Sequence, residues 1–320
     1  MTVATASNGV DTSGSRPSGV SVVIPTINRA EVLVDTVKDL LAQDFDRYEI
    51  IVVDQSDETN QAVVELLRES PVPARYFKAD NFRGLPQARN FGWQQARHDI
   101  VLYIDDDIRT TRTFVSTHYD TFCRTGAMMV AGGIDEAKGD HPTSHSPGSF
   151  NWWTGTAVRN FSVDQPGWCL HAPGGNFAVR RDVLSGVGGL DEVLSIGAAL
   201  YEESELALRM QAAGHRTWFE PAARLTHLAA PMGGCRVQRD VPRYMHGLAH
   251  NRGILIFRHL KPWHRPTAIA RLLLLGLSYS RADRSLRPLK STFAGLAAGR
   301  KAAARPPVKS ELRATECTSS

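Results

Sequence analysis

The sequence lacks the features that mark secreted and membrane-spanning proteins. Its 320 residues include only four cysteines, too few and too scattered for a disulfide framework or a zinc-binding pattern. The longest strongly apolar run near the C-terminus, 272–277, is far too short to span a bilayer. The N-terminal residues have no basic start followed by an apolar core, so no signal peptide is expected. We therefore expect a cytoplasmic protein with reduced thiols.

The composition indicates a globular protein with an uneven distribution of charge. Hydrophobic residues make up 42% and charged residues 22% of the chain, which is ordinary for one large or two modest α/β domains. The overall charge is +4, but residues 251–320 carry 14 Lys and Arg against 3 Asp and Glu. A basic C-terminal region on an acidic body predicts contact with an anionic surface, such as a membrane, a nucleic acid or an anionic polymer.

The most informative stretch, 100–108, is an apolar run that ends in the adjacent carboxylates of Asp105, Asp106 and Asp107. The apolar half predicts a strand buried on both faces, as in a parallel sheet covered by helices. The carboxylates then lie at the carboxyl end of the strand, where open α/β sheets bind ligands. Their mutual repulsion favours a divalent cation, and strand alternation puts Asp105 and Asp107 on one face. The alternative is a solvated acidic turn after a core strand.

Strands and helices are expected to alternate over the first hundred ordered residues. The apolar patterns predict strands at 20–25, 48–53, 75–77 and 100–104, with helices around 34–41, 60–69 and 85–97. This order predicts a doubly wound, nucleotide-binding sheet. The loops after Ile24, Val53 and Ile104 then converge at one edge, so their polar residues can form a single site.

The rest of the chain is expected to be less regular. Residues 135–171 are rich in Gly, Pro, Ser and Trp and predict a long functional or mobile loop. Residues 1–18 and the tail 299–320 are expected to be disordered. Between them we predict helices at 112–125, 202–213, 240–260 and 266–280, and strands at 128–131 and 217–219. The last two helices are basic and amphipathic.

Four segments carry a family resemblance. They are residues 22–29 (VVIPTINR), 51–57 (IVVDQSD), Gly84 with 88–92 (ARNFG) and 104–107 (IDDD), and 188–192 (GGLDE) with 201–209 (YEESELALR). In this order and spacing they resemble the inverting, nucleotide-sugar-dependent glycosyltransferases of the large bacterial family 2. One such motif alone is weak, but the four together cover roughly residues 19–230.

The resemblance implies an α/β protein of the GT-A (nucleotide-diphospho-sugar transferase) fold, a Rossmann-like mixed sheet flanked by helices with a C-terminal helical extension. The implied domain spans 19–235, with a nucleotide-binding half at 19–110 and an acceptor and catalytic half at 111–235. A basic helical extension follows at 236–298. Such an enzyme moves a sugar from a nucleoside diphosphate to an acceptor hydroxyl by direct displacement, which needs charge stabilisation on the leaving group and a base.

The resemblance also suggests residue roles. Asp105 and Asp107 match the metal motif for Mn²⁺ or Mg²⁺, and His227 matches a histidine that completes metal or diphosphate contacts, unless it is an ordinary surface histidine. Family members usually have Glu-Asp where this chain has Glu202-Glu203, so Glu203 aligns with the base and Glu202 is the alternate. At a helix start both glutamates also suit the macrodipole, so a capping role is the alternative.

The remaining predicted contacts concern the nucleotide and the sugars. The nucleotide set is Pro25, Thr26, Asn28, Asp54, Asp57, Arg89 and Asp106, with Asp106 meeting the ribose. Because Asp54 and Asp57 tolerate uracil or thymine, UDP or dTDP donors are favoured. Arg89 has the alternative of a surface salt bridge. The sugar set is Gly174, Gly175, Asn176, Trp152 and Trp153, the tryptophans having the alternative of anchoring their loop.

Two other functions would each fit a part of the sequence. A pyrophosphorylase on the same fold needs a glycine-rich loop after the first strand, and residues 24–29 contain no glycine. A non-enzymatic polyanion- or membrane-binding protein would use the basic tail but leaves the aspartates unexplained. We therefore expect a nucleotide-sugar donor and a glycan, glycolipid or small-molecule acceptor in polysaccharide or glycolipid synthesis, and no nucleic acid. The basic helices are expected to dock on the inner membrane face, or to form an oligomer interface.

Overall fold

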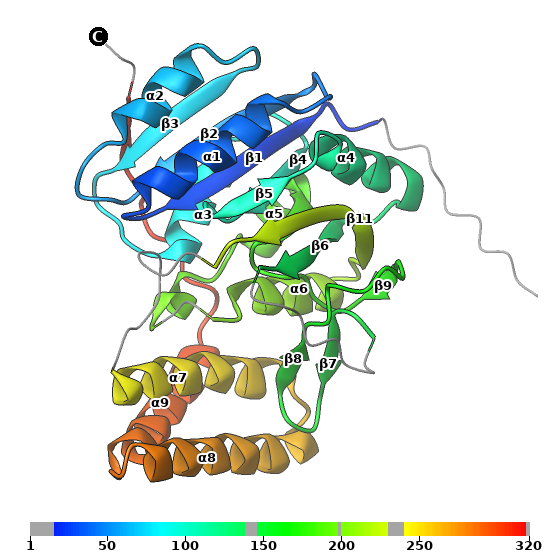
Figure 1. The fold of residues 1–320 in the computed structure, drawn as a ribbon. Helices are drawn as coiled ribbons and strands as arrows, with labels where there is room; N and C mark the ends of the chain where they lie inside the picture. Colours follow the sequence, from blue (N-terminus) through cyan, green and yellow to red (C-terminus); the bar gives the residue numbers. More distant parts are fainter. Residues whose placement is uncertain (1–15, 138–145, 198–199, 230–239, 318–320) are drawn as a thin grey trace, which may run out of the picture.

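Alternating strands and helices build the N-terminal half of the chain. The structure is a computed structural model and describes residues 16–137, 146–197, 200–229 and 240–317. Four strands pair in parallel in the order β3-β2-β1-β4, and three helices connect them (Figure 1). Their bounds are β1 Val20–Thr26, α1 Ala30–Leu41, β2 Tyr48–Asp54, α2 Gln61–Arg68, β3 Ala74–Ala79, α3 Leu85–Gln95 and β4 Ile100–Ile104. The predicted doubly wound arrangement is confirmed.

The second half of the chain extends the same sheet with strands of mixed direction. The antiparallel strand β10 joins β4 to β6, which gives the sheet order β12-β3-β2-β1-β4-β10-β6-β11-β5, and β9 pairs with β11. The elements are β5 Ile108–Thr110, α4 Phe114–Thr125, β6 Met129–Glu136, β9 Gly167–Cys169, β10 Asn176–Arg180, α5 Arg181–Val187, the short 3₁₀ helix η1 Glu192–Ser195, α6 Glu202–Ala212 and β11 Thr217–His227. The predicted halves at 19–110 and 111–235 therefore share one sheet.

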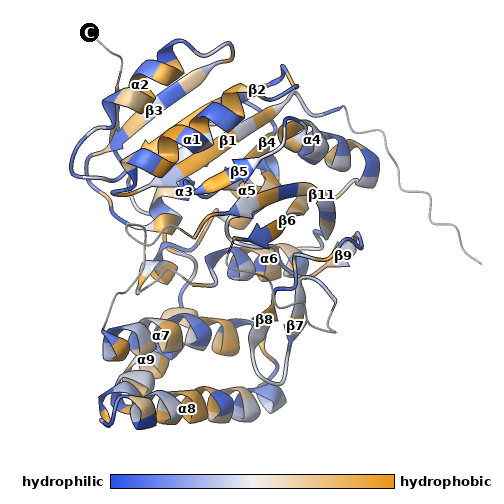
Figure 2. Cartoon of the chain, viewed as in Figure 1, coloured by the Kyte–Doolittle hydropathy of each residue, from blue (hydrophilic) through white to orange (hydrophobic). Residues whose placement is uncertain are grey.

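Two apolar cores cover the two faces of the sheet. In β1, Val22 and Ile24 pack into one core with α1, α2 and α4, whereas Val23 packs into the other with α3, α5 and α6. All seven β1 residues are buried, because helices cover both faces as the continuous apolar runs predicted. Figure 2 shows the hydrophobic strands inside and the more hydrophilic outer sides of the helices.

A helical extension packs below the sheet in the view of Figure 1. It consists of α7 Val241–His259, η2 Pro262–His264, α8 Arg265–Ala282 and α9 Arg287–Ala303, and the hairpin of β7 Ser149–Asn151 and β8 Thr156–Val158 lies against it. Helices α7 and α9 approach closely, since a Cβ on Gly295 or Gly299 would lie 2.2 Å from a carbonyl oxygen of α7. Within the described residues, no helix has both the length and the apolarity to cross a bilayer.

The prediction of a disordered tail from 299 onwards is wrong for the described residues. Helix α9 continues to Ala303, and β12 Ala314–Glu316 pairs antiparallel with the sheet edge at β3. Between them, the backbone N–H groups of Val308 and Ser310 donate to the Asp191 and Glu192 carboxylates at 3.0 and 2.9 Å. An edge strand offers unpaired backbone groups, and the tail satisfies them.

The predicted loop at 135–171 is also more regular than expected. Strand β6 reaches Glu136, and the hairpin β7–β8 and the short strand β9 follow later in the same segment. Residues 138–145 lie outside the described residues, as do 1–15, most of the N-terminal segment predicted to be disordered, and the predicted domain boundary at 235. The described part of this segment connects the sheet to the helical extension.

Candidate active site

Polar side chains from several strands converge at one edge of the sheet. The loops after β1, β2 and β4 open onto two cavities there. The main cavity, about 590 Å³, lies beside β4 and α6, and its charged or imidazole-bearing lining residues are Arg89, Asp105, Glu136, Arg159, Glu202, Glu203 and His227. The second cavity, about 540 Å³, lies between the loops after β1 and β2. The predicted convergence is therefore present in the structure.

Asp105, Asp107 and His227 form a cluster with the chemistry of a metal site. Each offers one ligand atom, and these atoms all lie within 4.8 Å of one another. His227 Nε2 lies 3.3 Å from Asp107 Oδ1, and His227 Nδ1 lies 2.8 Å from Glu136 Oε2. Carboxylate oxygens suit Mg²⁺ or Mn²⁺, and an imidazole suits Mn²⁺ somewhat better. The residues therefore fit a divalent cation.

The electrostatics of His227 reflect this acidic surrounding. Its hydrogen bond with Asp107 raises its pKa to about 9, against the effect of burial, with help from Glu136 and the charge of Asp105. Arg29 adds a second cation to the cluster, with Nη1 3.1 Å from Asp107 Oδ1. Cations thus already gather on the carboxylates that the sequence predicted for the metal.

Asp106 does not take the predicted place at the ribose. Its carboxylate is buried and accepts hydrogen bonds from Thr26 Oγ1 at 2.7 Å and Arg29 Nη1 at 2.8 Å. Burial raises the pKa of Asp106 to about 6, although Arg29 and the Thr26 hydrogen bond act in the opposite direction. Asp106 lies in the bend between β4 and β5, where its hydrogen bonds tie this bend to the end of β1 and the loop that follows it.

The second cavity contains the predicted nucleoside residues of the first two loops. Thr26, Asn28, Asp54 and Asp57 all line it. Asp54 is buried and accepts hydrogen bonds from Ser56 N–H at 2.8 Å and from the Tyr76 hydroxyl, whereas Asp57 is 76% exposed and pairs with Arg83. Pro25 is buried inside β1. The cavity therefore offers one buried carboxylate and one exposed carboxylate.

Arg89 is a buried residue in the wall of the main cavity. The alternative of a surface salt bridge is wrong, because the side chain is 0% exposed. It donates hydrogen bonds to Glu202 and to the Gly174 carbonyl, and lies 3.5 Å from Asp105 Oδ1. Arg89 thus connects the first carboxylate of the metal cluster to the start of α6.

The two glutamates at the start of α6 differ in their surroundings. Glu202 is 2% exposed and is held by Arg89. Burial raises its pKa well above the usual value, and the charge of Glu203 adds to this, while Arg89 opposes it. Glu203 also lines the cavity, and its Oε1 accepts a hydrogen bond from Ser204 Oγ at 3.0 Å. Only Glu202 is tied to a buried cation, so Glu203 is the freer carboxylate.

Of the predicted sugar contacts on and before β10, the two glycines line the main cavity and the asparagine does not. Gly174 and Gly175 line the main cavity, and a Cβ on Gly175 would lie 2.5 Å from Asp105 Oδ2. Asn176 is a correction, because it is fully buried in β10. Its amide nitrogen donates to the carbonyls of Gly133 and Ala223, each at 2.8 Å. Both amide hydrogens are therefore used inside the sheet, and none is left for a sugar hydroxyl.

Trp152 and Trp153 lie at the tip of the β7–β8 hairpin, against the helical extension. The Trp152 ring packs 4.8 Å from Phe150, and the Trp153 ring lies 4.5 Å from His264. Neither belongs to the lining of the main cavity. The structure thus favours the anchoring alternative for Trp152, which packs against the core of the extension, whereas the Trp153 side chain is 57% exposed.

The main cavity is also lined by residues for which the sequence predicted no role, among them Glu136, Arg159 and Tyr201. Glu136 ends β6, so a carboxylate after an apolar strand was the available signal. Tyr201 has a φ of 76°, a left-handed conformation that is rare outside glycine and asparagine. Such backbone strain tends to occur at functional sites, but no sequence pattern predicts it.

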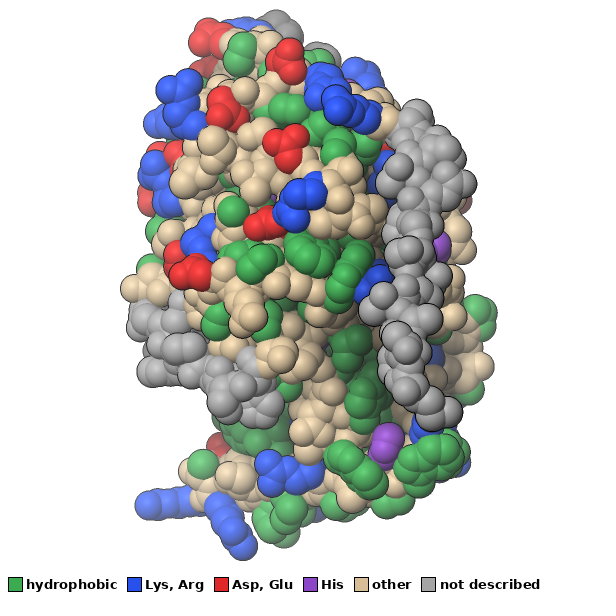
Figure 3. All heavy atoms as spheres, turned by 90° about the vertical axis from the view of Figure 1, so that its right-hand side faces the viewer, with side chains coloured by type: hydrophobic (Ala, Val, Ile, Leu, Met, Phe, Trp, Pro, Cys, Tyr) green, Lys and Arg blue, Asp and Glu red, His purple; other side chains and the backbone are tan. Residues whose placement is uncertain are grey.

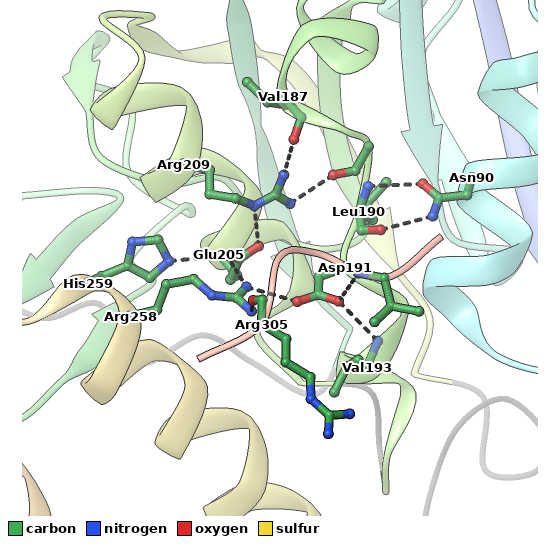
Figure 4. A network of polar contacts seen from close by, with 12 residues as sticks. Asn90, Val187, Leu190, Asp191, Val193, Glu205, Arg209, Arg258, His259 and Arg305 are labelled. Atoms are coloured by element: carbon green, nitrogen blue, oxygen red, sulfur yellow. Dashed lines mark hydrogen bonds and ion pairs between the residues drawn. The ribbon is translucent and has the colours of Figure 1, made fainter. Parts of the chain in front are cut away.

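A network of polar contacts holds the helix that carries the glutamates (Figure 4). Glu205 is fully buried and accepts hydrogen bonds from Arg209 and Arg258, both at 2.7 Å, and from His259 at 3.1 Å. Arg258 also donates to Asp191 at 2.8 Å. Because Arg258 and His259 belong to α7, the network fixes the helical extension to α6.

Comparison with known proteins settles the family. The model of "Glycosyl transferase family 2" matches residues 21–188, more than half of the chain. The chain belongs to glycosyl transferase family 2. Members of this family are inverting glycosyltransferases, and the mixed sheet with its flanking helices has the GT-A fold.

Individual relatives are more distant. The chain is 27% identical over 217 residues to the glucosyl-dolichyl phosphate glucuronosyltransferase of Haloferax volcanii, covering 65% of this chain and 68% of that one. It is 36% identical over 90 residues to the GalNAc(5)-diNAcBac-PP-undecaprenol β-1,3-glucosyltransferase of Campylobacter jejuni, which is 28% of this chain and 29% of the relative. A mannosyltransferase of Pyrobaculum calidifontis, solved with GDP-Man and Mn²⁺, has the same fold, with 17% identity, a TM-score of 0.53 and coverage of 92% and 88%.

Proposed function

We propose that this glycosyltransferase moves a sugar from a nucleoside diphosphate, UDP or dTDP being favoured, to an acceptor hydroxyl with inversion and with the help of Mn²⁺ or Mg²⁺. The observation that carries the proposal is the main cavity, whose lining includes Asp105 and His227 of the metal cluster together with Glu203. Direct displacement needs these two functions on opposite sides of the sugar, one at the leaving diphosphate and one at the acceptor.

Thr26, which lines the second cavity, donates a hydrogen bond to Asp106, the sequence neighbour of both carboxylates of the metal cluster. Asp107, Asp105 and His227 would hold the cation, which when bound supplies positive charge to the departing diphosphate. Thr26, Asn28, Asp54 and Asp57 would bind the nucleoside in the second cavity. Gly175 brings the backbone close to Asp105, so that the carboxylate is held at the cavity wall. The donor sugar then lies in the main cavity with its anomeric carbon toward Glu203.

Glu203 is the proposed base. It takes the proton of the acceptor hydroxyl while that oxygen forms its bond to the anomeric carbon, and the bond to the diphosphate oxygen breaks. Glu202 is tied to Arg89 and is therefore a positioning residue, which is supported by its burial and raised pKa. Glutamate replaces the usual aspartate and reaches one methylene further. The position of α6 decides where this longer side chain reaches in the cavity, and the hydrogen bonds of Glu205 fix that position.

The acceptor is proposed to be a glycan or glycolipid at the cytoplasmic face of a membrane, in polysaccharide or glycolipid synthesis. Two relatives carry lipid-linked saccharides in their names, one with a dolichyl phosphate and one with an undecaprenol diphosphate. This supports a lipid-linked acceptor. The cation of Arg159 at the cavity wall would suit an anionic group on such an acceptor.

Calorimetric titration with UDP, dTDP, GDP and CDP, each with and without Mn²⁺, tests the donor site. We expect tight, metal-dependent binding of UDP or dTDP, and its loss in Asp107→Asn, while the exposed Asp120→Asn binds normally. Glu203→Gln should keep this binding and lower turnover by roughly 10²–10⁴-fold, with the exposed Glu65→Gln as control. If no nucleotide binds at any metal concentration, or if Glu203→Gln keeps full turnover, the proposal is wrong.

A further inference from the structure

Large apolar side chains are exposed mainly on one part of the molecule. Five side chains of this kind, each more than half exposed, lie on the helical extension or on the hairpin that packs against it: Trp153, Trp263, Leu274, Leu286 and Phe293. Exposed apolar side chains scattered singly need no explanation, but a contiguous group of them marks an interaction surface. We call this group the apolar face.

The apolar face is continuous along η2 and α8. The Trp153 ring lies 4.5 Å from the His264 ring, which lies 6.0 Å from the Trp263 ring. From Trp263 onwards, exposed residues recur at helical spacing through Ala270 to Leu274. Figure 3 shows apolar side chains gathered at the lower end of the molecule, over the helical extension, with Lys and Arg side chains beside them.

The charge around the apolar face is almost entirely positive. Residues 261–305 contain ten Lys and Arg but a single acidic residue, Asp283. Arg271 and Arg281 are exposed on α8, three residues before and seven residues after Leu274, so they flank it on the same side of the helix. The Lys261 Nζ lies 5.3 Å from the centre of the Trp263 ring. Cations and aromatic rings are thus interleaved on one surface.

We propose that this face docks on an anionic lipid bilayer, with α8 and α9 lying in the headgroup region. Amphipathic helices bind membranes through buried apolar area and through attraction to anionic lipids, and tryptophan favours the membrane interface. No helix of the described residues is able to cross a bilayer, so the contact is peripheral. A second copy of the chain is a poorer occupant, because two strongly basic faces repel each other.

The docked orientation would bring the membrane close to the active site. Tyr201 lines the main cavity and also packs against the apolar core of the helical extension. The surface would therefore deliver an acceptor whose lipid part stays in the bilayer. This link to an acceptor rests on the proposed function, whereas the docking itself does not, so vesicle binding and nucleotide binding have to be measured separately.

The test is co-sedimentation of the full chain with phosphatidylcholine vesicles, either pure or containing about 30% phosphatidylglycerol. The charge variant combines Arg271→Gln, Arg281→Gln and Lys290→Gln, three exposed cations of the extension. Its matched control makes the same change at three exposed cations of the sheet domain, Lys38, Arg97 and Arg112. The apolar variant combines Trp263→Ser with Phe293→Ser, and Trp168→Ser, on β9, is its control.

We expect binding to the anionic vesicles at low salt, little binding to the pure ones, and weakening at about 0.5 M salt, where the charges are screened. The charge variant should lose about fivefold in partitioning per cation, or about a hundredfold in total, and the apolar variant roughly a hundredfold. The control variants should bind like the parent chain. Thermal unfolding and metal-dependent nucleotide binding should stay unchanged in all variants, which shows that each is folded.

Three results would overturn the docking proposal. The full chain ignores anionic vesicles at low salt, or the control variants lose as much binding as the face variants. The third is a stable dimer, seen by light scattering, that the face variants dissociate while vesicle binding is absent. Vesicle binding without any nucleotide binding would instead contradict the proposed function and leave the docking in place.

Discussion

Replacing Glu205 with glutamine should destabilise the protein in a way that depends on pH. The carboxylate is fully buried and accepts hydrogen bonds from Arg209, Arg258 and His259 (Figure 4). Burial alone would raise its pKa, but the His259 hydrogen bond and the two arginine charges outweigh it and lower the pKa from 4.5 to about 2. Glutamine keeps the shape of the side chain but removes the charge that these cations need.

The size of the effect follows from the pKa. One pKa unit is worth about 1.4 kcal/mol, so the ionised carboxylate contributes about 3 kcal/mol to the free energy of unfolding at pH 7. Removing one partner of a buried ion pair costs about 3–5 kcal/mol, which agrees. Because the folded-state pKa is lowered, this stabilisation is complete above pH 4.5 and disappears as the pH falls toward 2. The difference between parent and Glu205→Gln should therefore shrink in that window.

This stability difference can be measured by thermal unfolding of the parent chain and of Glu205→Gln at pH 7, 5, 4 and 3. At roughly 2 °C per kcal/mol, the variant should unfold about 6 °C lower at pH 7 and approach the parent at the acid end. Glu65→Gln, on the exposed side of α2, removes the same charge and should differ by less than about 1 °C. A Tm difference that is the same at every pH, or none at pH 7, would refute the reasoning.

Two further predictions concern the cavity wall and the tail. Gly175→Ala should weaken Mn²⁺-coupled nucleotide binding at least tenfold by calorimetry, since its Cβ would lie 2.5 Å from Asp105 Oδ2. Gly174→Ala is the control, because its nearest contact is at 3.6 Å; equal losses in both would contradict this reasoning. Ending the chain after Ala303 should lower the free energy of unfolding by about 3 kcal/mol and promote aggregation in light scattering, because two charge-assisted hydrogen bonds and the cover of β3 are lost. Removing only residues 318–320 should change neither.

The parts of the site that lie at strand ends were predictable from the sequence. Charge is rare inside a strand that is buried on both faces, so the carboxylates of Asp54 and Asp105 were expected where β2 and β4 end. Parallel strands end at the same edge, and this brought the residues together without any knowledge of the loops. The alternation of the first four strands with helices along the chain followed from the same apolar patterns. These features depend on local patterns alone.

The features that sequence reasoning missed depend on partners far along the chain. Helix α9 packs closely on α7 because glycine lets its backbone approach His246 and His250, and this is visible only once the two helices are paired. The strand β12 has three residues and exists because β3 offers an open edge. Asn176 follows two glycines and resembled a ligand contact, but its place in β10 between two other strands buries it.

The start of α6 is where the parts of the molecule meet, and this bears on how the active site is held. Arg89 of α3 holds Glu202 from the nucleotide-binding half, and Arg258 of α7 holds Glu205 from the helical extension. Glu203 lies between these two anchored positions in the sequence, so its backbone is held on both sides while its carboxylate is not paired with either arginine. A shift of the extension would therefore move the proposed base relative to the metal cluster. Docking of the extension on a bilayer would then orient the proposed base as well as the whole protein.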